Sequence, residues 1–338
     1  MRVLFWGTPA YAVPSLDALV AAGHQIVGVV SQPDRRRGRG KALVASPVKA
    51  RALELDLPVF TPERIRRELQ VQQQLADLGA DVYVVVAFGQ ILPPEVLQQP
   101  PLGCWNGHGS LLPRWRGAAP IQWSLIEGDE RSGVGIMAME EGLDTGPVLL
   151  ERDTPITLLD NAQTLGERLS QLTATLLVEA LPRIEAAGPG PEPERLNRLQ
   201  VRVQGDAGLR YARQLSKDDY WIDWQASALT LHRRVMGLFP GATTLWRGER
   251  LKLLATEPLI ARLQHQLSPA AAALVGRWSG VEAEPGTVLA AEAGLGLVVA
   301  TTGCPLLLRQ AQRAGRSASA DQALLQQLDA QPGDRLGV

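Results

Sequence analysis

Short apolar runs alternate with amphipathic stretches along the first half of the chain. Residues 2–7, 25–31 and 81–87 are rich in β-branched and aromatic residues and predict strands, and the last is apolar on both faces, as in a central parallel strand. Further strands are predicted at residues 58–60, 102–105, 133–139 and 148–155, and helices at residues 11–22, 47–56, 63–78, 119–127 and 164–186. This alternation predicts an α/β fold with a Rossmann-like, mostly parallel sheet that has helices on both faces.

The pattern changes after residue 188. The run Gly188-Pro189-Gly190-Pro191 has the composition of a linker. Beyond it, turn residues separate short apolar runs, which lie at residues 250–255, 286–290, 295–300 and 306–309 after a helix predicted at residues 230–236. This spacing predicts a smaller antiparallel β-barrel of the OB-like type. We therefore expect an α/β domain at 1–188, a linker at 189–208 and a barrel domain at 209–338.

Composition limits the class of protein. The 338 residues are 45% hydrophobic and 20% charged, which is typical of a globular chain with a substantial core. Only two cysteines occur, so no disulfide framework is predicted and a reducing compartment is favoured. The apolar run at residues 3–6 is too short for a signal peptide, and no run is long enough to span a membrane. We expect a cytoplasmic protein that does not associate with membranes.

An amide, an imidazole and a hydroxyl lie within five residues at Asn106, His108 and Ser110. On an extended segment, Asn106 and His108 would point their side chains the same way because they are two residues apart. An amide donor beside an imidazole can hold a developing oxyanion and move a proton. The alternative is structural, with both residues capping the loop that follows a strand.

Asp144 is the candidate partner of this pair. It lies between Gly142 and Gly146 in a loop between two predicted strands, where an aspartate usually only forms a turn. If the strands before both loops are parallel, Asp144 and His108 share the carboxyl edge of the sheet, where open α/β sheets bind ligands. The carboxylate could then orient the imidazole of His108.

Several classes of chemistry are disfavoured by missing motifs. Gly7-Thr8-Pro9 follows the first strand without the other two glycines of a dinucleotide fingerprint, and Pro9 has no amide donor. The sequence also contains no Walker lysine motif and no Cys/His spacing typical of a metal site. Hydride transfer, nucleotide hydrolysis and zinc chemistry are therefore disfavoured, and no metal is expected.

Two loops are unusual for connections in a parallel sheet. Residues 34–41 carry five cations and two glycines in a connection that normally has two to six residues. This loop is either solvated or binds a phosphate backbone. Residues 86–93 form an apolar loop after the central strand, which either covers the sheet edge or receives a flat heterocycle.

Together these segments resemble the folate-dependent formyltransferases, most closely the branch that acts on methionyl-tRNA. The matching segments are residues 7–9, 31–34, 38–41, 46–49, 87–93, 106–122, 142–146, 215–217, 222–224 and 331–334. They extend over nearly the whole chain, and the block at 110–122 is highly specific. The resemblance implies transfer of the formyl group of 10-formyltetrahydrofolate, as co-substrate, to the amino group of methionine on initiator tRNA.

The resemblance also assigns roles to residues. Asn106, His108 and Asp144 would be catalytic. The folate would contact Phe88, Ile91, Leu92, Ser110, Leu111, Leu112, Pro113, Glu140 and Glu141. The tRNA would contact Arg35, Arg36, Arg37, Arg39, Lys41, Arg114, Arg116 and Lys217, and the second domain would bind the tRNA backbone. Gly107 departs from the family pattern, because a branched apolar residue is usual at this position.

Two other functions compete with this interpretation. A formyltransferase of the same family could act on a small amine, either an amino sugar or a purine precursor, but such a substrate needs neither the basic loop nor a second domain. A catalytically silent tRNA-binding protein would not need Asn106, His108 and Asp144 together. We expect the protein to be a monomer.

Overall fold

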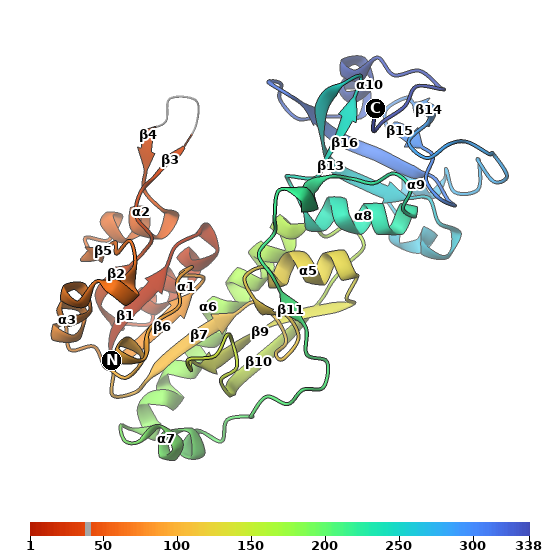
Figure 1. Cartoon of the computed structure of the whole chain (residues 1–338). Coiled ribbons are helices and arrows are strands. Elements are labelled where there is room, and N and C mark those ends of the chain that lie inside the picture. The colour runs from red at the N-terminus through yellow and green to blue at the C-terminus, as the bar shows by residue number, and fades with distance from the viewer. Residues whose placement is uncertain (38–41) are drawn as a thin grey trace. The chain divides into compact units, whose positions relative to one another are not determined.

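The computed structural model describes residues 1–37 and 42–338, and they divide into two compact units (Figure 1). Unit 1 consists of Met1–Pro120, Arg131–Thr154 and Gly166–Arg213. Unit 2 consists of Ile121–Glu130, Pro155–Leu165 and Gln214–Val338. Each unit is described on its own below.

A mixed, mostly parallel sheet lies at the centre of unit 1. Within the described residues its seven strands have the order β10-β9-β7-β6-β1-β2-β5. Their bounds are β1 (Arg2–Gly7), β2 (Gln25–Val30), β5 (Val59–Phe60), β6 (Val82–Val86), β7 (Cys104–His108), β9 (Arg131–Ala138) and β10 (Val148–Pro155). Every pair from β5 to β7 is parallel, whereas β9 is antiparallel to β7. The strands β1, β2 and β6 are apolar on both faces because helices cover both sides of the sheet.

The helices of unit 1 cover both faces of this sheet. They are α1 (Val13–Ala21), α2 (Pro47–Glu54), α3 (Leu69–Asp77), α4 (Pro94–Leu97), α7 (Glu192–Leu199) and all but the first turn of α6 (Ala162–Ala187). On one face, Leu75 of α3 and Val96 of α4 join Trp6 in a single core cluster. On the other face, Thr173 of α6 lies behind Gly107 of β7.

Two small pairings complete unit 1. β3 (Arg35–Arg37) and β4 (Ala42–Val44) form an antiparallel hairpin, and β8 (Arg116–Gly117) pairs in parallel with β11 (Tyr211–Ala212).

Residues 63–78 were predicted as one helix, but the structure has a short 3₁₀ turn at Ile65–Arg67 before α3. The break arises because side chains take the backbone donors there: Gln90 accepts from Ile65 N at 2.9 Å and Glu68 from Arg64 N at 2.6 Å.

Unit 2 is built on an antiparallel sheet of order β12-β13-β16-β15-β14, with β17 paired to β16. The strands are β12 (Thr243–Trp246), β13 (Glu249–Pro258), β14 (Val288–Glu292), β15 (Gly296–Val299), β16 (Leu306–Arg313) and β17 (Ser319–Ala320). The helices are α8 (Ala228–Gly237), α9 (Pro269–Ala272), α10 (Asp321–Leu328) and most of α5 (Pro120–Glu127). Near the end of the chain, Leu336 bridges Trp246 and Arg335 bridges Thr287, which links the two ends of the sheet as in a small barrel. The predicted fold class is confirmed.

The segment predicted as a linker is partly structured. It contains α7, and residues 166–213 belong to unit 1. Arg195 of α7 donates from Nη1 to the carbonyl oxygen of Leu102 at 2.7 Å, which fastens the helix to the start of the segment that leads into β7. Among the described residues, no helix is long and apolar enough to cross a membrane.

His232 of α8 is a fully buried histidine in unit 2. Its Nε2 lies 2.7 Å from the carbonyl oxygen of Leu158, and its Nδ1 lies 3.1 Å from the hydroxyl of Thr256. Burial lowers the pKa of His232 from 6.5 to about 4, although both hydrogen bonds and the charge of Glu257 oppose this change. The folded chain therefore keeps this imidazole neutral in a pH range where an exposed histidine gains a proton.

This burial predicts a loss of stability in acid. The folded pKa of His232 lies below the unfolded value, so between pH 6.5 and about 4 the unfolded state binds the proton more readily. We expect the free energy of unfolding to fall by up to about 3 kcal/mol as the pH drops through this window. Thermal unfolding of the full chain from pH 7.5 to pH 4 would measure it.

His232→Gln should show a shallower fall over the same pH range, because its amide can bond Leu158 without titrating. His265→Gln is the matched control, since His265 is exposed. Equal pH dependence of wild type and His232→Gln would contradict the prediction.

Candidate active site

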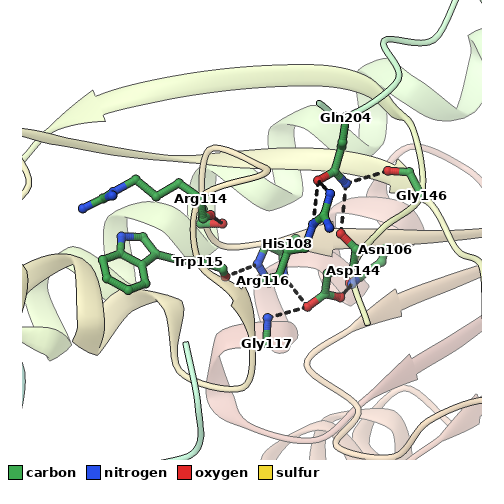
Figure 2. Close-up of polar contacts among 10 residues, drawn as sticks. Asn106, His108, Arg114, Trp115, Arg116, Gly117, Asp144, Gly146 and Gln204 are labelled. Carbon is green, nitrogen blue, oxygen red and sulfur yellow. Dashed lines mark hydrogen bonds and ion pairs between the residues drawn. The ribbon is translucent and has the colours of Figure 1, made fainter. Parts of the chain in front are cut away.

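Strand β7 positions Asn106 and His108. The sequence predicted a strand only to residue 105, but β7 continues through His108, with Asn106 paired to Val85 of β6 and His108 to Gly135 of β9. Both side chains point to the same face and meet Asp144, as expected for residues two apart (Figure 2). Asn106 Nδ2 lies 3.5 Å from Asp144 Oδ1, and His108 Nδ1 lies 3.7 Å from Asp144 Oδ2.

The imidazole of His108 is buried between two acceptors. Its Nε2 lies 3.0 Å from the carbonyl oxygen of Trp115, and because a carbonyl can only accept, Nε2 carries a hydrogen. Its Nδ1 faces the Asp144 carboxylate, with which it forms an ion pair when the ring is protonated. The two contacts fix the orientation of the ring, with one nitrogen toward the loop carbonyl and the other toward a carboxylate.

Asp144 reaches His108 by a different route from the one predicted. The prediction placed both loops at the carboxyl edge of parallel strands, but β9 is antiparallel to β7 and its last residue, Ala138, lies beside Trp105. The loop at residues 139–147 instead folds back, so that Asp144 Oδ2 accepts a hydrogen bond from Gly117 N at 2.8 Å. The expected proximity of Asp144 to His108 is found, although the topological reason for it was wrong.

Three residues around this site adopt the left-handed backbone region that favours glycine. They are Ala87 (φ 49°), Trp115 (φ 64°) and Asp144 (φ 53°). Such conformations cost on the order of 1 kcal/mol each for residues with a Cβ, and they persist where surrounding contacts hold them, often at functional sites. Trp115 supplies the carbonyl that accepts from His108, and Asp144 supplies the carboxylate. Two of these three residues therefore supply the groups that contact the imidazole of His108.

Gly107 faces away from the site, toward α6. A Cβ at this position would lie 2.5 Å from Cγ2 of Thr173. The Thr173 side chain cannot easily turn away, because its hydroxyl lies 2.8 Å from the Tyr11 hydroxyl and donates to the carbonyl oxygen of Leu169 at 2.8 Å. The space that a branched residue would need is thus occupied by the methyl group of Thr173.

A cleft of about 270 Å³ opens at the carboxyl ends of β1, β2 and β6. It is lined by Thr8, Pro9, Gln32, Pro33, Arg35, Val44, Ser46, Ala87, Phe88 and Gly89. The carbonyl oxygen of Phe88 accepts from Thr8 Oγ1 at 2.8 Å and from Gln32 Nε2 at 3.3 Å, which ties the loop after β6 to the loops after β1 and β2. A cleft at the carboxyl ends of parallel strands is where this class of fold binds ligands.

The residues predicted to contact folate differ in exposure. Phe88 lines the cleft while its ring packs edge-on against Trp6, with centroids 5.1 Å apart. Leu92 belongs to the same core cluster, whereas Ile91 is 71% exposed. The side chain of Leu92 therefore contributes to the core of unit 1, and among these three only Ile91 presents its side chain to solvent.

The loop after β7 carries four more residues predicted to bind folate. Ser110 is buried and its hydroxyl donates to the carbonyl oxygen of Arg114 at 2.7 Å. Leu112 is buried against Met137 and Val148, while Leu111 and Pro113 are partly exposed.

The predicted pair Glu140 and Glu141 lies on the loop that carries Asp144, and both are exposed. Glu140 accepts from the Thr145 hydroxyl at 3.3 Å and lines a second cleft of about 470 Å³ beside α7. Within residues 1–37 and 42–338, no group of three or more His, Cys, Asp or Glu residues could hold a metal ion.

The cations predicted to contact tRNA lie in different surroundings. Arg35 and Arg36 are exposed on β3, to which Arg37 also belongs, while Arg39 and Lys41 lie outside the described residues. The guanidinium of Arg114 lies 4.6 Å from the centre of the Trp115 ring, and Lys217 is exposed in unit 2.

Arg116 requires a correction. It was predicted to contact tRNA, but it is 7% exposed and its Nε and Nη2 donate to Oε1 of Gln204 at 3.0 and 2.9 Å. A buried guanidinium held in this way does not reach a phosphate backbone. Gln204 itself was not singled out, because a lone glutamine in a predicted linker carries no recognisable signal.

Family comparisons cover most of the chain. The formyl transferase family matches residues 1–181, and the formyl transferase C-terminal domain matches residues 214–328. A methionyl-tRNA formyltransferase of Synechococcus sp. strain RCC307 is 72% identical over 97% of this chain and 100% of its own length. The proteins of the same name from Synechococcus sp. strain WH7803 and Prochlorococcus marinus strain MIT 9303 are 68% and 60% identical, each over 99% or more of both chains.

Solved structures share the fold at low identity. An N-formyltransferase of Helicobacter canadensis in complex with folinic acid and dTDP-3-aminofucose has a TM-score of 0.62 and 14% identity, over 93% of this chain and 99% of its own. HypX of Aquifex aeolicus in complex with tetrahydrofolic acid has a TM-score of 0.58 and 16% identity, over 96% of this chain and 46% of its own. At these identities the likeness establishes the fold alone.

The packing behind Gly107 predicts that a side chain there will be harmful. Gly107→Ala should lower the free energy of unfolding by about 1–3 kcal/mol, because its Cβ would overlap Thr173 Cγ2. Thr173→Ser removes that methyl group and keeps the hydroxyl, so the double variant should recover most of the loss. Thermal or urea unfolding of the two single variants and the double variant would measure the coupling. A double variant no more stable than Gly107→Ala would show that Thr173 is not the obstacle.

Proposed function

The chain belongs to the formyl transferase family, and we propose that it transfers the formyl group of 10-formyltetrahydrofolate to the free amino group of methionyl initiator tRNA. The product would be N-formylmethionyl-tRNA for translation initiation. The observation that carries this proposal is the 59–72% identity, over essentially the full length, to proteins named methionyl-tRNA formyltransferase. A small amine as acceptor has less support, since the sugar formyltransferases resemble this chain at only 14–19% identity.

The proposed reaction needs little activation of the nucleophile. An α-amine with a pKa near ~8 is partly neutral at pH 7, so its lone pair can attack the formyl carbon directly. The attack forms a C–N bond and a tetrahedral intermediate with an oxyanion. Collapse then breaks the bond between the formyl carbon and folate N10, which takes up a proton while the new amide nitrogen loses one.

Each of the three candidate residues has a role in these steps. In the proposed mechanism the Asn106 amide and the protonated His108 ring stabilise the oxyanion by hydrogen bonds. Asp144, 3.7 Å from His108 Nδ1, would stabilise the protonated ring and help carry the proton from the amine toward N10. Because Nε2 of His108 donates to the Trp115 carbonyl, the substrate oxygen would have to compete with that carbonyl for the same hydrogen.

We further propose where the two substrates bind. The folate would lie near the clefts beside the loops at residues 87–92, 110–113 and 139–147, close to the catalytic residues. The tRNA would contact the cations of β3 and the residues that follow it, together with Arg114 and Lys217. In this proposal residues 1–188 form the catalytic domain and residues 209–338 the tRNA-binding domain, and the protein acts as a monomer in the cytoplasm.

The decisive experiment is a direct acceptor comparison. The protein is incubated with 10-formyltetrahydrofolate and either charged initiator Met-tRNA or a set of nucleotide-linked amino sugars, and the products are detected by mass. The proposal expects formylation of Met-tRNA alone. Formylation of a sugar amine without formylation of Met-tRNA would overturn it and favour the small-amine alternative.

The three catalytic assignments predict large losses of turnover. Asn106→Ala, His108→Ala and Asp144→Asn should each lower kcat by at least ~10²-fold, as expected when a stabilising donor or proton carrier is removed. Asparagine is chosen at position 144 because it tolerates the left-handed backbone there. His265→Ala, at an exposed position of unit 2, is the control for His108. A variant with nearly wild-type kcat would remove its residue from the mechanism.

The cations at residues 34–41 predict a change in the salt dependence of tRNA binding. Arg36→Ala and Arg39→Ala should each weaken binding and reduce the slope of log K against log salt by about 1, since each phosphate contact releases counterions. Arg66→Ala is the matched control, because Arg66 is exposed elsewhere in unit 1. Binding of charged initiator tRNA at 50–200 mM salt would measure the slopes. An unchanged slope in both variants would argue against this part of the tRNA site.

A further inference from the structure

Gln204 reaches from the segment after α7 into the active site. The residues around it, 202–203 and 205–208, are exposed, whereas Gln204 is partly buried. Its Nε2 donates to the carbonyl oxygens of Asp144 at 2.9 Å and Gly146 at 2.7 Å, and its Oε1 accepts twice from Arg116 (Figure 2). A side chain 60 positions along the chain from Asp144 therefore holds the backbone of Asp144 itself.

All the hydrogen-bonding capacity of this amide is used. A glutamine amide has two N–H donors and an oxygen with two lone pairs, which equals the four contacts found. The orientation of the amide follows from its neighbours. If its oxygen and nitrogen were exchanged, the NH₂ group would face the Arg116 guanidinium and the oxygen would face two carbonyls. Glutamine therefore suits this position, because its oxygen faces the Arg116 guanidinium and its NH₂ group faces two carbonyl oxygens.

The segment after α7 also holds β8, the strand whose Gly117 N donates to the Asp144 carboxylate. β11 pairs with β8, and Arg116 N donates to the carbonyl oxygen of Arg210 at 3.0 Å. β8 is linked to Asp144 in two ways. Gly117 N donates directly to the Asp144 carboxylate, and Arg116 donates to Gln204, which in turn donates to the Asp144 carbonyl oxygen. At the other end of the segment, Arg202 exchanges backbone hydrogen bonds of 2.8 and 2.9 Å with Val148 of β10. Residues 202–212 are therefore fastened on both sides of the loop that carries Asp144.

This arrangement explains how a strained residue is kept in place. Asp144 has a left-handed backbone (φ 53°), and in this conformation its carboxylate lies 3.5 Å from Asn106 Nδ2 and 3.7 Å from His108 Nδ1. Loss of the Gln204 contacts would free the carbonyl of Asp144 and leave the buried guanidinium of Arg116 without this acceptor. The carboxylate could then turn away from the imidazole without any change in the catalytic residues themselves.

We propose that Gln204 is a positioning residue for formyl transfer, which fixes the Asp144 loop so that the carboxylate faces His108, with Arg116 holding the Gln204 amide in the required orientation. The inference rests on the proposed function and goes beyond it, because it extends the catalytic apparatus to the segment of unit 1 that follows α7. Gln204 acts through Asp144 and has no role in contacting the reacting atoms.

A competing role for Gln204 is to satisfy the buried Arg116 alone, and Gln204→Glu separates the two. Glutamate keeps, and strengthens, the acceptor for Arg116, but it places oxygen against the carbonyls of Asp144 and Gly146 and removes both donors. If Gln204 positions the loop, Gln204→Glu and Gln204→Ala are both impaired. If it only satisfies Arg116, Gln204→Glu behaves as wild type, and the proposal is overturned.

The kinetic test compares Gln204→Ala and Gln204→Glu with Asp206→Ala, an exposed control on the same segment. We expect kcat to fall about 10-fold or more in both Gln204 variants, because small displacements of a catalytic group have effects of this size or larger. KM for folate and for Met-tRNA should change by no more than about 2-fold, since in this proposal neither substrate touches Gln204. A loss that appears in KM with kcat unchanged would overturn the positioning role.

A double-variant cycle tests whether Gln204 acts through Asp144. In an Asp144→Asn background, Gln204→Ala should cause no further loss of kcat, because the carboxylate that it positions is already gone. Losses that multiply would show an independent role and overturn the proposal.

A measurement without substrate separates this inference from the proposed function. Amide hydrogen exchange of residues 139–147 should be faster in both Gln204 variants than in wild type and in Asp206→Ala. Unchanged exchange in this loop would overturn the positioning role even if Met-tRNA is formylated. If wild type formylates no Met-tRNA, the proposed function fails, while the exchange rates still decide whether Gln204 fixes the loop.

Discussion

The position of one carboxylate, that of Asp144, is the constraint on which the rest of the site depends. An aspartate orients a histidine only if its loop is held to within a fraction of an ångström, and this loop follows β9, an antiparallel strand that ends beside the start of β7. Asp144 Oδ2 accepts from Gly117 N, and its backbone carbonyl accepts from Gln204. The loop is thus held by contacts to β8 and to the segment after α7, rather than by a regular sheet edge.

Strand β7 is also held in place, by packing against α6 on the side away from Asp144. Successive side chains of a strand point to opposite faces, so the register that turns Asn106 and His108 toward Asp144 also turns Gly107 toward α6. There the methyl group of Thr173 fills the space that a larger residue at position 107 would need. The hydroxyl of Thr173 is hydrogen-bonded to that of Tyr11, which lies in the 3₁₀ turn Ala10–Ala12 before α1, so this turn and α6 support β7 on the side away from Asp144. Gly107 and Thr173 are therefore matched in size within the same packing layer.

Much of the fold and part of the site could be predicted from local pattern. The apolar run at residues 2–7 is β1 with the same bounds, and the fully apolar run after Asp81 is the buried strand β6. The same-side placement of Asn106 and His108 follows from the period of a strand and is found in the structure. The proximity of Asp144 to His108 was also expected, but for the wrong reason, since β9 was assumed to be parallel and is antiparallel to β7. The direction of β9 could not be predicted because it depends on its pairing with β7 and not on its own composition.

The family resemblance, the alternation of strands and helices and the same-side placement of Asn106 and His108 could all be predicted from the sequence, because periodicity and motif spacing involve residues close in sequence. The burial of Arg116 and the contacts of Gln204 could not be predicted in this way. These two residues are 88 positions apart, and their contact exists only because β11 pairs with β8 when unit 1 is folded. An arginine beside a basic motif looks like a phosphate ligand until the packed chain shows that it is enclosed. The folded chain thus determines which polar side chains are exposed and which are enclosed by contacts between distant segments.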